Sequence, residues 1–309
     1  MVEANASAAP GLPLCAVVVA YHPDPDVVEN LHALVRECGR VLVVDNGSNT
    51  DAQTAMTAVP GVTLLPQGRN LGLAVALNLG LDRAGELGFT WAVTFDQDSR
   101  PEPGFVQALW AMHLAHPAAA VVAPRIREIG GVDENHYRWL RPRHRRPFFA
   151  LECCHVPGLA AVTIAVTSGS LMELVEWRRL GRFEAGFFID YIDIDYCLRV
   201  VRAGRRVAVA HDAVLAHRLG ARRKRVLFGR DFRPMHHAPF RHYYMARNRI
   251  IVWRRHALAV PHWVAFDLSF AVYNYTRVLL FEDQRWAKFK AIVRGTWHGL
   301  MGKKGEMPP

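Results

Sequence analysis

The sequence predicts an α/β fold in which a mostly parallel sheet carries helices on both faces. Short apolar runs rich in branched residues alternate with helical patterns over the first hundred residues, in the order strand, helix, strand, helix, strand, helix, strand. This order favours parallel pairing, because each helix returns the chain to the edge where the next strand begins. Acids close several of the predicted strands, and three helical segments follow the α/β part.

Length and composition limit the class of protein. The chain has 309 residues, a formal net charge of +10 and a sequence pI of about 9.7, and it is long enough for one large α/β domain with an appendage. Its apolar segment Leu258–Phe281 contains Asp267, Asn274 and Arg277, so we expect no membrane span. The run Leu14–Ala20 has no basic segment before it, and we interpret it as a strand rather than a signal peptide.

The cysteines and the basic residues indicate the setting. Five cysteines, two of them adjacent and none in a C-x-x-C pair, favour neither a disulfide framework nor a zinc site, so we expect a cytoplasmic protein. Seven arginines lie within Arg125–Arg146, and six arginines with Lys224 lie within Arg218–Arg233. Such clusters suit nucleic acid, anionic lipid or diphosphate ligands, and charge alone does not choose among them.

The first half of the chain has the clearest elements. Residues 1–12 are small, polar and interrupted by proline and glycine, so we expect disorder there. After the strand Leu14–Ala20, Asp24-Pro25-Asp26 supplies a cap, a proline for the first turn and an early acid, which predicts a helix to about Arg36 before Gly39. The next predicted elements are strands over Val41–Val44, Val62–Leu65 and Phe89–Phe95, and helices over Asp51–Thr57 and from Leu71 to about Gly85.

The second half alternates less regularly. The predicted helices cover Glu102–His116, a stretch from Ser168 to about Trp177, and Asp193–Ala203. The predicted strands cover Ala118–Ala123, Val156–Thr167, Arg205–Ala210 and Ala213–His217, with Arg125–Arg146 as an irregular basic insertion. The three C-terminal helices are expected over Phe240–His256, Pro261–Phe281 and Gln284–His298.

The strand Phe89–Phe95 leads into the strongest candidate site. It delivers Asp96 and Asp98, and alternation along extended backbone would place both carboxylates on one face with Gln97 pointing away. Ligands bind at the carboxyl edge of open α/β sheets, and paired carboxylates there suit a divalent cation that carries substrate phosphates. A lone Asp-x-Asp is also common on protein surfaces.

Asp45 ends the second predicted strand, close to the same edge of the sheet. An aspartate in that place can accept a hydrogen bond from the ring N–H of a uracil or thymine base. It can equally start a turn by accepting hydrogen bonds from backbone N–H groups. The sequence leaves both interpretations open.

A cluster of acids among bulky apolar residues lies at the start of the predicted helix Asp193–Ala203. It contains Asp190, Asp193 and Asp195 within six residues. Partial burial raises the pKa of a carboxyl toward the range that suits a general base. We assign Asp195 to a structural pair with Arg199, four residues on, and keep Asp193 as the candidate base; helix capping by Asp190 or Asp193 is the alternative.

Three further residues have both a chemical and a structural interpretation. His217 closes the last predicted strand, where an imidazole can bind manganese or serve packing alone. Arg247 and Asn248 lie in an aromatic-rich helix, where they can clamp diphosphate oxygens or belong to a solvated basic face.

Seven short segments carry a resemblance to a known family. They are Val17–Pro23, Val43–Ser48, Asn70–Ala74, Phe95–Ser99, Ser168-Gly169, Phe188–Asp195 with Arg199, and Tyr244–Asn248. In order and spacing they resemble the family 2 glycosyltransferases of GT-A fold, and within them the bacterial rhamnosyltransferases, over roughly residues 14–255. One departure concerns the Glu-Asp pair of many relatives, because Ile192 stands in the Glu position and leaves Asp193 to match the Asp.

The resemblance implies a Rossmann-like GT-A domain over residues 13–235, with a donor half of about 13–124 and an acceptor half of about 125–235, before a helical segment over 236–309. Asp193 would be the base, and Asp98, Asp96 and His217 would hold Mg²⁺ or Mn²⁺. The residues expected to bind the donor nucleotide are Tyr21, Asp45, Asn70, Asp96, Gln97 and Asp98. Those expected to bind the acceptor or the sugar are Ser168, Gly169, Asp190, Arg247 and Asn248.

The implied reaction is inverting transfer of a sugar, L-rhamnose from dTDP-β-L-rhamnose, to a hydroxyl of a cell-surface polysaccharide precursor such as a polyprenyl-diphosphate-linked glycan. A UDP-sugar donor is one alternative, and a non-catalytic basic module for anionic lipid or nucleic acid is another. The segment Leu258–His298 is expected to lie on the cytoplasmic face of a membrane through aromatic residues such as Trp263 and through Lys288, Lys290 and Arg294. Packing on the catalytic domain or on a second subunit is the other interpretation.

Overall fold

The structure is a computed structural model of the chain, and it describes residues 12–128, 138–141, 150–153, 162–217, 225–227, 230–232 and 237–308. The disorder expected for residues 1–12 falls almost wholly outside the described residues. The same holds for residues 129–137 and 142–146 of the expected basic insertion.

The central sheet has eight strands, β1 (Leu14–Ala20), β2 (Val41–Asp45), β3 (Val62–Pro66), β4 (Trp91–Asp96), β5 (Ser99–Pro101), β6 (Ala119–Glu128), β9 (Ser170–Glu173) and β10 (Arg206–His217). Their order in space is β3-β2-β1-β4-β9-β6-β10-β5. β1 pairs in parallel with β2 and β4, β2 with β3, and β6 with β10, which confirms the mostly parallel sheet. Two short hairpins lie outside it, β7 (Arg138–Arg141) with β8 (Ala150–Cys153), and β11 (Arg225–Leu227) with β12 (Arg230–Phe232).

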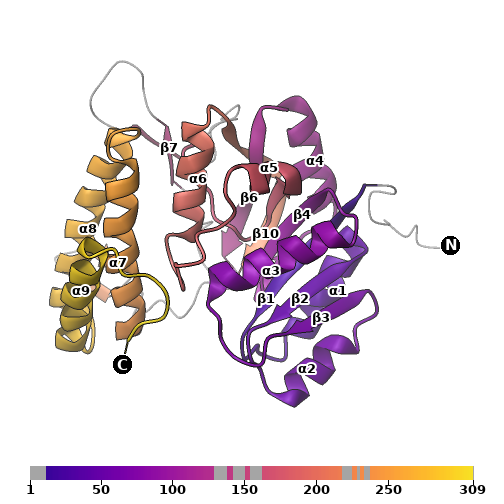
Figure 1. Ribbon diagram of the computed structural model, residues 1–309, viewed down its shortest axis with the longest axis horizontal. Coiled ribbons are helices and arrows are strands. Elements are labelled where there is room, and N and C mark those ends of the chain that lie inside the picture. Colours follow the sequence, from indigo (N-terminus) through magenta and orange to yellow (C-terminus); the bar gives the residue numbers. More distant parts are fainter. Residues whose placement is uncertain are drawn as a thin grey trace.

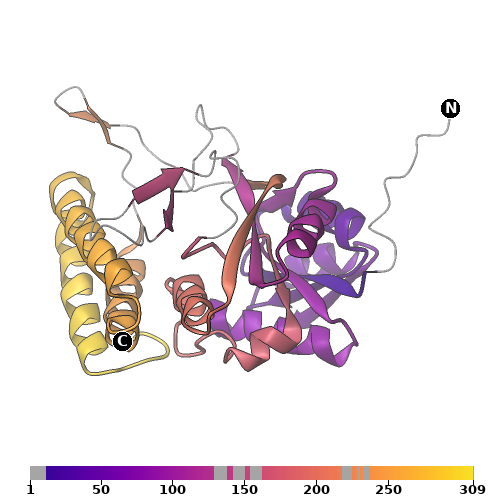
Figure 2. The same ribbon diagram turned by 90° about the horizontal axis from the view of Figure 1, so that it is seen from above.

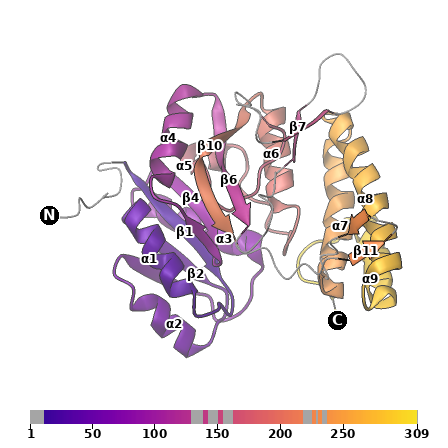
Figure 3. The same cartoon turned by 180° about the vertical axis from the view of Figure 1, so that it is seen from behind.

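Helices cover both faces of the sheet, as the alternating pattern predicts. One face packs against α1 (Val27–Cys38), α2 (Thr50–Thr57) and α4 (Phe105–Ala115), which lie in front of the sheet in Figure 3. The other face packs against α3 (Leu73–Glu86), α5 (Leu174–Arg179) and α6 (Ile192–Arg202) (Figure 1). Each helix turns an apolar side inward, and α1, for example, buries residues at intervals of three and four.

Three C-terminal helices form a further layer beyond α6, namely α7 (Pro239–His256), α8 (Pro261–Phe281) and α9 (Arg285–Leu300). Figure 2 shows this layer standing beside the sheet. Val252 of α7 and Trp263 of α8 are buried in the same apolar cluster as α6, so the layer shares the core. Proline begins both α7 and α8, where its missing N–H leaves no helical bond unmade. None of the described helices combines the length and the hydropathy needed to span a bilayer.

The sequence-based prediction is wrong around Ser168. No strand forms over the described part of Val156–Thr167 apart from an isolated bridge from Val162 to Val207. The chain turns at Gly169, which has a φ of +78°, and then forms β9 antiparallel to β4 and β6. The predicted helix from Ser168 is correspondingly confined to α5. An apolar run that packs into the core without strand pairing has the same pattern as a buried strand.

Two predicted strands, Arg205–Ala210 and Ala213–His217, are joined in one long strand, β10. A register shift between Ala210 and Val214 interrupts its pairing with β6. A bulge adds residues that have no partner on the neighbouring strand, and it breaks the alternation of inward and outward side chains. This break explains why the sequence pattern indicates two strands.

Two glycines allow α9 to lie directly against α7. A Cβ atom on Gly295 would stand 2.3 Å from the carbonyl oxygen of Tyr243, and one on Gly299 would stand 2.6 Å from that of Arg247. These glycines are four residues apart and so share one face of α9. The opposite face of α9 is therefore turned away from α7.

Gly295→Ala should lower the free energy of unfolding by about 1–3 kcal/mol, because the added methyl group forces two helix backbones apart. The matched control is Gly85→Ala in α3, whose Cβ would meet only the movable end of the Arg178 side chain. Thermal or urea unfolding of both variants measures the effect. Equal stability of the two would contradict the close packing of α9 on α7.

Candidate active site

Four separate segments meet near the carboxyl ends of β1, β2 and β4. They are residues 45–48 from the end of β2, residues 69–73 at the start of α3, residues 96–99 from the end of β4, and residues 186–193 before and within α6. Backbone contact between two of them is close, because the N–H of Leu73 donates to the carbonyl oxygen of Phe188 at 2.7 Å. At Gly72, which has a φ of +85°, a Cβ atom would stand 2.8 Å from the carbonyl oxygen of Phe188.

Asp96 ends β4, but alternation does not continue to Asp98, because Gln97 and Asp98 form a turn into β5. Side-chain alternation therefore cannot place the carboxylates of Asp96 and Asp98 on one face, as expected. Their relative position depends on the turn instead. Gln97 contacts the segment after β1 and the helix α1. Its side-chain oxygen accepts a hydrogen bond from the N–H of Tyr21 at 2.7 Å, and its carbonyl oxygen accepts one from Asn30 at 3.1 Å.

Ser168 and Gly169 lie beneath this turn. The Ser168 hydroxyl accepts a hydrogen bond from the N–H of Asp96 at 3.0 Å and lies 2.8 Å from the hydroxyl of Ser99. Gly169 donates its N–H to the carbonyl oxygen of Thr94, and a Cβ atom there would stand 2.6 Å from Pro124. Ser168 is only 4% exposed. Both residues thus bind the backbone at the end of β4, where the turn begins.

Asp45 has the turn geometry that the sequence left as an alternative. Its side chain is fully buried. One carboxylate accepts hydrogen bonds from the N–H of Ser48, at 3.1 and 3.2 Å, and from the side-chain amide of Gln53 at 2.8 Å. The next residue, Asn46, connects this turn to the segment before α3. It accepts a hydrogen bond from the N–H of Leu71 at 3.2 Å and donates one to Asn70 at 3.2 Å.

The segment before α6 contains two consecutive residues in the left-handed region, Asp190 with a φ of +64° and Tyr191 with a φ of +66°. For residues other than glycine this conformation costs of order 1–3 kcal/mol each, and surrounding contacts must hold it. α7 supplies them. Arg241 forms a forked pair with the Asp190 carboxylate at 3.0–3.2 Å, and the Asn248 amide donates to the carbonyl oxygens of Ile189 and Asp190, each at 2.9 Å.

Arg247 and Asn248 are fully buried in this structure. The Arg247 guanidinium donates to the carbonyl oxygens of Gly186 and Gly305, and its Nε donates to Asn248. Apart from the hydrogen bond between them, their side chains thus donate to the backbone of residues 186–190 and of the C-terminal segment. We propose that these two residues serve the site by holding that loop, in place of the direct acceptor contact expected from the sequence.

Asp193 lies in the first turn of α6 and is partly buried. Burial raises its pKa from 3.8 to about 6, and the negative charges of Asp190 and Asp96 act in the same direction. The N–H of Ile194, which donates to Oδ1 of Asp193 at 2.8 Å, opposes the rise. The structure therefore brings Asp96, Asp190 and Asp193 within electrostatic reach, although they come from separate motifs.

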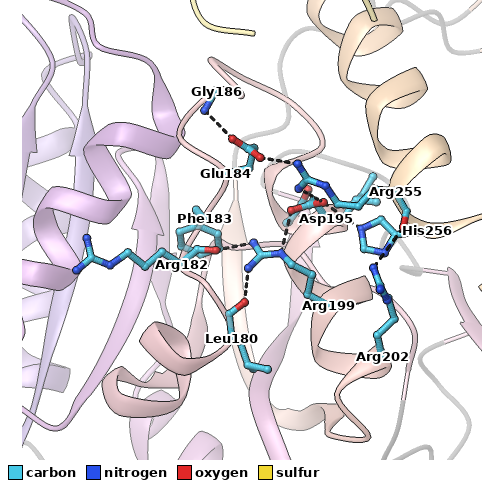
Figure 4. Close-up of polar contacts among 12 residues, drawn as sticks. Leu180, Arg182, Phe183, Glu184, Gly186, Asp195, Arg199, Arg202, Arg255 and His256 are labelled. Atoms are coloured by element: carbon cyan, nitrogen blue, oxygen red, sulfur yellow. Dashed lines mark hydrogen bonds and ion pairs between the residues drawn. The ribbon is translucent and has the colours of Figure 1, made fainter. Parts of the chain in front are cut away.

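Asp195, two residues on, has a different environment, which Figure 4 shows. Its buried carboxylate is bound by Arg199 at 3.0 Å, by Arg255 at 2.8 Å and by Nε2 of His256 at 3.0 Å. Burial alone would raise the pKa of Asp195, but the hydrogen bond from His256 and the charges of both arginines outweigh it and lower the pKa. The expected pair with Arg199 is present, and Asp195 is structural.

Arg241 is a site residue that the sequence analysis missed. Burial would lower the pKa of its guanidinium, yet the carboxylates of Asp190, Asp96 and Asp193 together raise it. Arg241 thus stands among all three acids. Nothing in the local pattern distinguishes it from the other arginines of a basic helix, because only the packing of α7 brings it to the loop.

The metal ligands expected from the sequence can be placed only in part. Asp96 and Asp98 flank the turn between β4 and β5, and the backbone of His217 is paired with Ser99, next to Asp98. The side chain of His217 lies outside the described part of the structure. Over the described side chains, no group of three or more His, Cys, Asp or Glu residues is arranged to hold a metal ion.

Known proteins resemble this chain in sequence. Residues 15–209 match the family model described as Glycosyl transferase family 2. The dTDP-rhamnosyl transferase RfbF of Shigella flexneri is 27% identical over 298 residues, which cover 94% of this chain and 96% of that protein. An N-acetylglucosaminyl-diphospho-decaprenol L-rhamnosyltransferase of Mycobacterium tuberculosis is 32% identical over 130 residues, which cover 38% of this chain and 42% of that protein.

Solved structures resemble it in fold. GalNAc-T7, solved with UDP, GalNAc and Mn²⁺, superposes with a TM-score of 0.58 at 13% identity, over 79% of this chain and 48% of that one. TarS of S. aureus superposes with a TM-score of 0.55 at 13% identity, over 87% of this chain and 44% of that one. This chain spans less than half the length of either solved chain. At such low identity the likeness concerns the fold alone, and it confirms the GT-A architecture.

Proposed function

This chain belongs to glycosyl transferase family 2, and from that membership we propose that it transfers L-rhamnose from dTDP-β-L-rhamnose to a hydroxyl of a glycan acceptor. The choice of sugar and of nucleotide rests on the full-length similarity to a protein named as a dTDP-rhamnosyl transferase. The proposed acceptor class, a glycan on a polyprenyl diphosphate, follows the partial similarity to a decaprenol-linked rhamnosyltransferase.

The observation that carries the mechanism is the environment of Asp193. A carboxyl with a pKa near 6 is largely ionised at neutral pH and still basic enough to take a proton from a hydroxyl as that hydroxyl reacts. In the proposed step the acceptor oxygen attacks C1 while Asp193 removes its proton. The bond from C1 to the diphosphate oxygen breaks on the opposite side, so a β-linked donor gives an α-linked product.

The donor is proposed to lie along the carboxyl edge of β1, β2 and β4. Tyr21 is 47% exposed there, and its backbone is fixed to the turn through Gln97. Asn70 is partly buried, and its side-chain oxygen also accepts from the N–H of Gly72 at 2.9 Å. Asp45 is proposed to shape the turn at residues 45–48, since its own carboxylate is buried. Asp190, held by Arg241, is proposed to border the acceptor.

The turn between β4 and β5 fits a divalent cation by its chemistry. Asp96 and Asp98 offer hard oxygen ligands, and the backbone register places His217 one residue from Asp98 across the strand pair. A bound Mg²⁺ or Mn²⁺ would neutralise the charge of the diphosphate leaving group. Arg241 is placed to contribute positive charge on the same side, because it already acts on Asp96 and Asp193.

Donor choice and metal use are tested together by thermal shift. With Mn²⁺ present, dTDP-β-L-rhamnose should raise the melting temperature more than UDP-sugars do, since ligand binding stabilises the folded state. Asp98→Ala should abolish the Mn²⁺-dependent part of this rise, whereas Glu29→Ala, which removes an exposed acid paired with Arg100 beside the turn, should keep it. A larger shift with a UDP-sugar would favour the alternative donor, and an unchanged Mn²⁺ effect in Asp98→Ala would exclude Asp98 as a ligand.

Asp193→Asn should lower kcat by about 10²- to 10⁴-fold with nucleotide affinity near that of the wild type, because the base is removed and the donor contacts stay. In the wild type, kcat should rise with pH through about 6 and level off above it, since only the ionised carboxylate accepts a proton. Nucleotide-release assays across pH measure both effects.

Asp195→Asn is the contrasting variant for this assay. It should lower the melting temperature, because it leaves the guanidinium groups of Arg199 and Arg255 around a neutral amide in a buried site. If Asp190→Asn abolishes turnover and Asp193→Asn does not, the base has been assigned to the wrong acid.

We further propose that α9 lies against an anionic membrane surface. Its outward apolar stripe consists of Trp286, Phe289, Val293, Trp297 and Leu300, which are 39–66% exposed. α9 contains no acidic residue, and Arg285 and Lys290 are exposed on it. An apolar stripe with basic neighbours suits a membrane surface, where the stripe can enter the acyl-chain region and the basic side chains can contact anionic headgroups. The sequence-based assignment is corrected in two places, since Trp263 is buried and Lys288 is buried against Glu282 at 2.8 Å.

Flotation with vesicles that contain phosphatidylglycerol tests this surface. The wild type should float with the vesicles at low salt and less at high salt, and a Trp286→Ser/Trp297→Ser variant should remain at the bottom. Leu114→Ser is the control, because Leu114 is 61% exposed on α4, away from α9. The alternative outcome is that the wild type does not bind vesicles and is a dimer in solution, whereas the tryptophan variant is a monomer. That outcome would assign the stripe to a subunit interface instead.

A further inference from the structure

A buried polar network connects the loop before α6 to the C-terminal helices. The Tyr191 hydroxyl lies 3.0 Å from both carboxylate oxygens of Asp267 on α8. Asp267 also accepts hydrogen bonds from Trp253 Nε1 at 2.8 Å and from Arg249 Nε at 3.1 Å, both on α7. Three elements therefore meet at one carboxylate.

The network is closed to solvent and its central groups are paired. Tyr191, Asp267 and Arg249 are each 6% exposed or less. Burial, followed by the charge of Asp267, raises the pKa of Tyr191, so its hydroxyl stays protonated and donates to the carboxylate. Arg249 Nε in turn donates to the Tyr191 oxygen. Satisfied polar groups in a medium of low dielectric hold one geometry, because any rearrangement leaves a buried group unpaired.

Tyr191 is also the residue from which α6 begins. Its carbonyl oxygen accepts the N–H of Asp195 at 3.0 Å, the first helical hydrogen bond of α6. Its left-handed backbone, and that of Asp190 before it, determine the direction in which the helix leaves the loop. Asp193 is two residues further on. A change in the torsion angles of Tyr191 would therefore move the carboxyl of Asp193.

We propose that Tyr191 and Asp267 are positioning residues of the active site: the contact between them holds the left-handed turn that places Asp193 against the acceptor. The inference rests on the proposed role of Asp193 as base. It assigns a catalytic task to α8, which is far from the nucleotide-binding motifs in the sequence and contributes none of the residues expected at the site.

Tyr191→Phe tests this with the smallest change, since it removes one hydroxyl and keeps the ring. We expect kcat to fall by about 10- to 100-fold, as for a misplaced reacting group, with nucleotide affinity unchanged. The pH at which kcat is half-maximal should also shift, because the surroundings of Asp193 change. Backbone amides of residues 186–194 should exchange hydrogen faster than in the wild type, a readout that does not depend on activity.

Tyr275→Phe is the matched control. Its hydroxyl accepts from Nη1 of the same Arg249 at 2.7 Å, but it belongs to α8, and its hydrogen bond goes to α7 rather than to the loop. This variant should keep the wild-type kcat, pH profile and exchange over residues 186–194. Equal losses of kcat in both variants would mean that the network only stabilises the fold. Wild-type kcat and exchange rates in Tyr191→Phe would exclude the positioning role. An active Asp193→Asn would instead overturn the proposed base, whatever the tyrosine variants show.

Discussion

The buried carboxylate of Asp195 is the interaction on which the arrangement of the helical layer depends. An unpaired charge in this position would be strongly destabilising, so α6 cannot leave the end of α7 that supplies Arg255 and His256. Arg255 extends the contact to Glu184 at 2.6 Å, and Glu184 also binds Lys304 at 2.9 Å near the C-terminus. With this end of α7 fixed, the preceding turns of the helix present Arg241, Asn248 and Arg249 to the loop before α6. The C-terminal helices thus share the core of the α/β part and hold the loop before α6, so they are not an independent appendage.

Most of the fold could be predicted because its signals are local. The four N-terminal strands and the helices α1, α6, α7, α8 and α9 lie within a few residues of their expected bounds. Apolar periodicity and the prolines that begin α7 and α8 mark them directly in the sequence. The acids expected to cap α1 and α6 form no side-chain cap hydrogen bond at the N-cap positions. The pair of Asp195 with Arg199 could also be predicted, since a partner four residues along a helix is a local property. β9 was missed because an apolar run packed against a sheet and a strand within it have the same composition.

The remainder of the site depends on contacts between residues far apart in the chain. Asp190 and Arg241 are 51 residues apart, and Asn78 holds the backbone of Phe183 over 105 residues. A single sequence does not indicate such pairs, because each residue is unremarkable among its neighbours. The same limit explains Lys288, whose burial against Glu282 depends on how α8 and α9 meet. It also applies to Asp45. Its place at the end of β2 was predicted, but the sequence did not determine which groups donate hydrogen bonds to its carboxylate.

The contact of Tyr191 with Asp267 spans 76 residues and has a consequence for the order of folding. A chain is made from its N-terminus, and α/β units can form as they leave the ribosome. The sheet strands and the start of α6 are complete in sequence well before α8 is synthesised. The left-handed turn at Asp190 and Tyr191 gains its partners only with α7, which supplies Arg241 and Asn248, and then with α8, which supplies Asp267. In the nascent chain the sheet should therefore form before this turn is held in place. Chains released before α8 is made would carry the sheet without the contact that holds Tyr191.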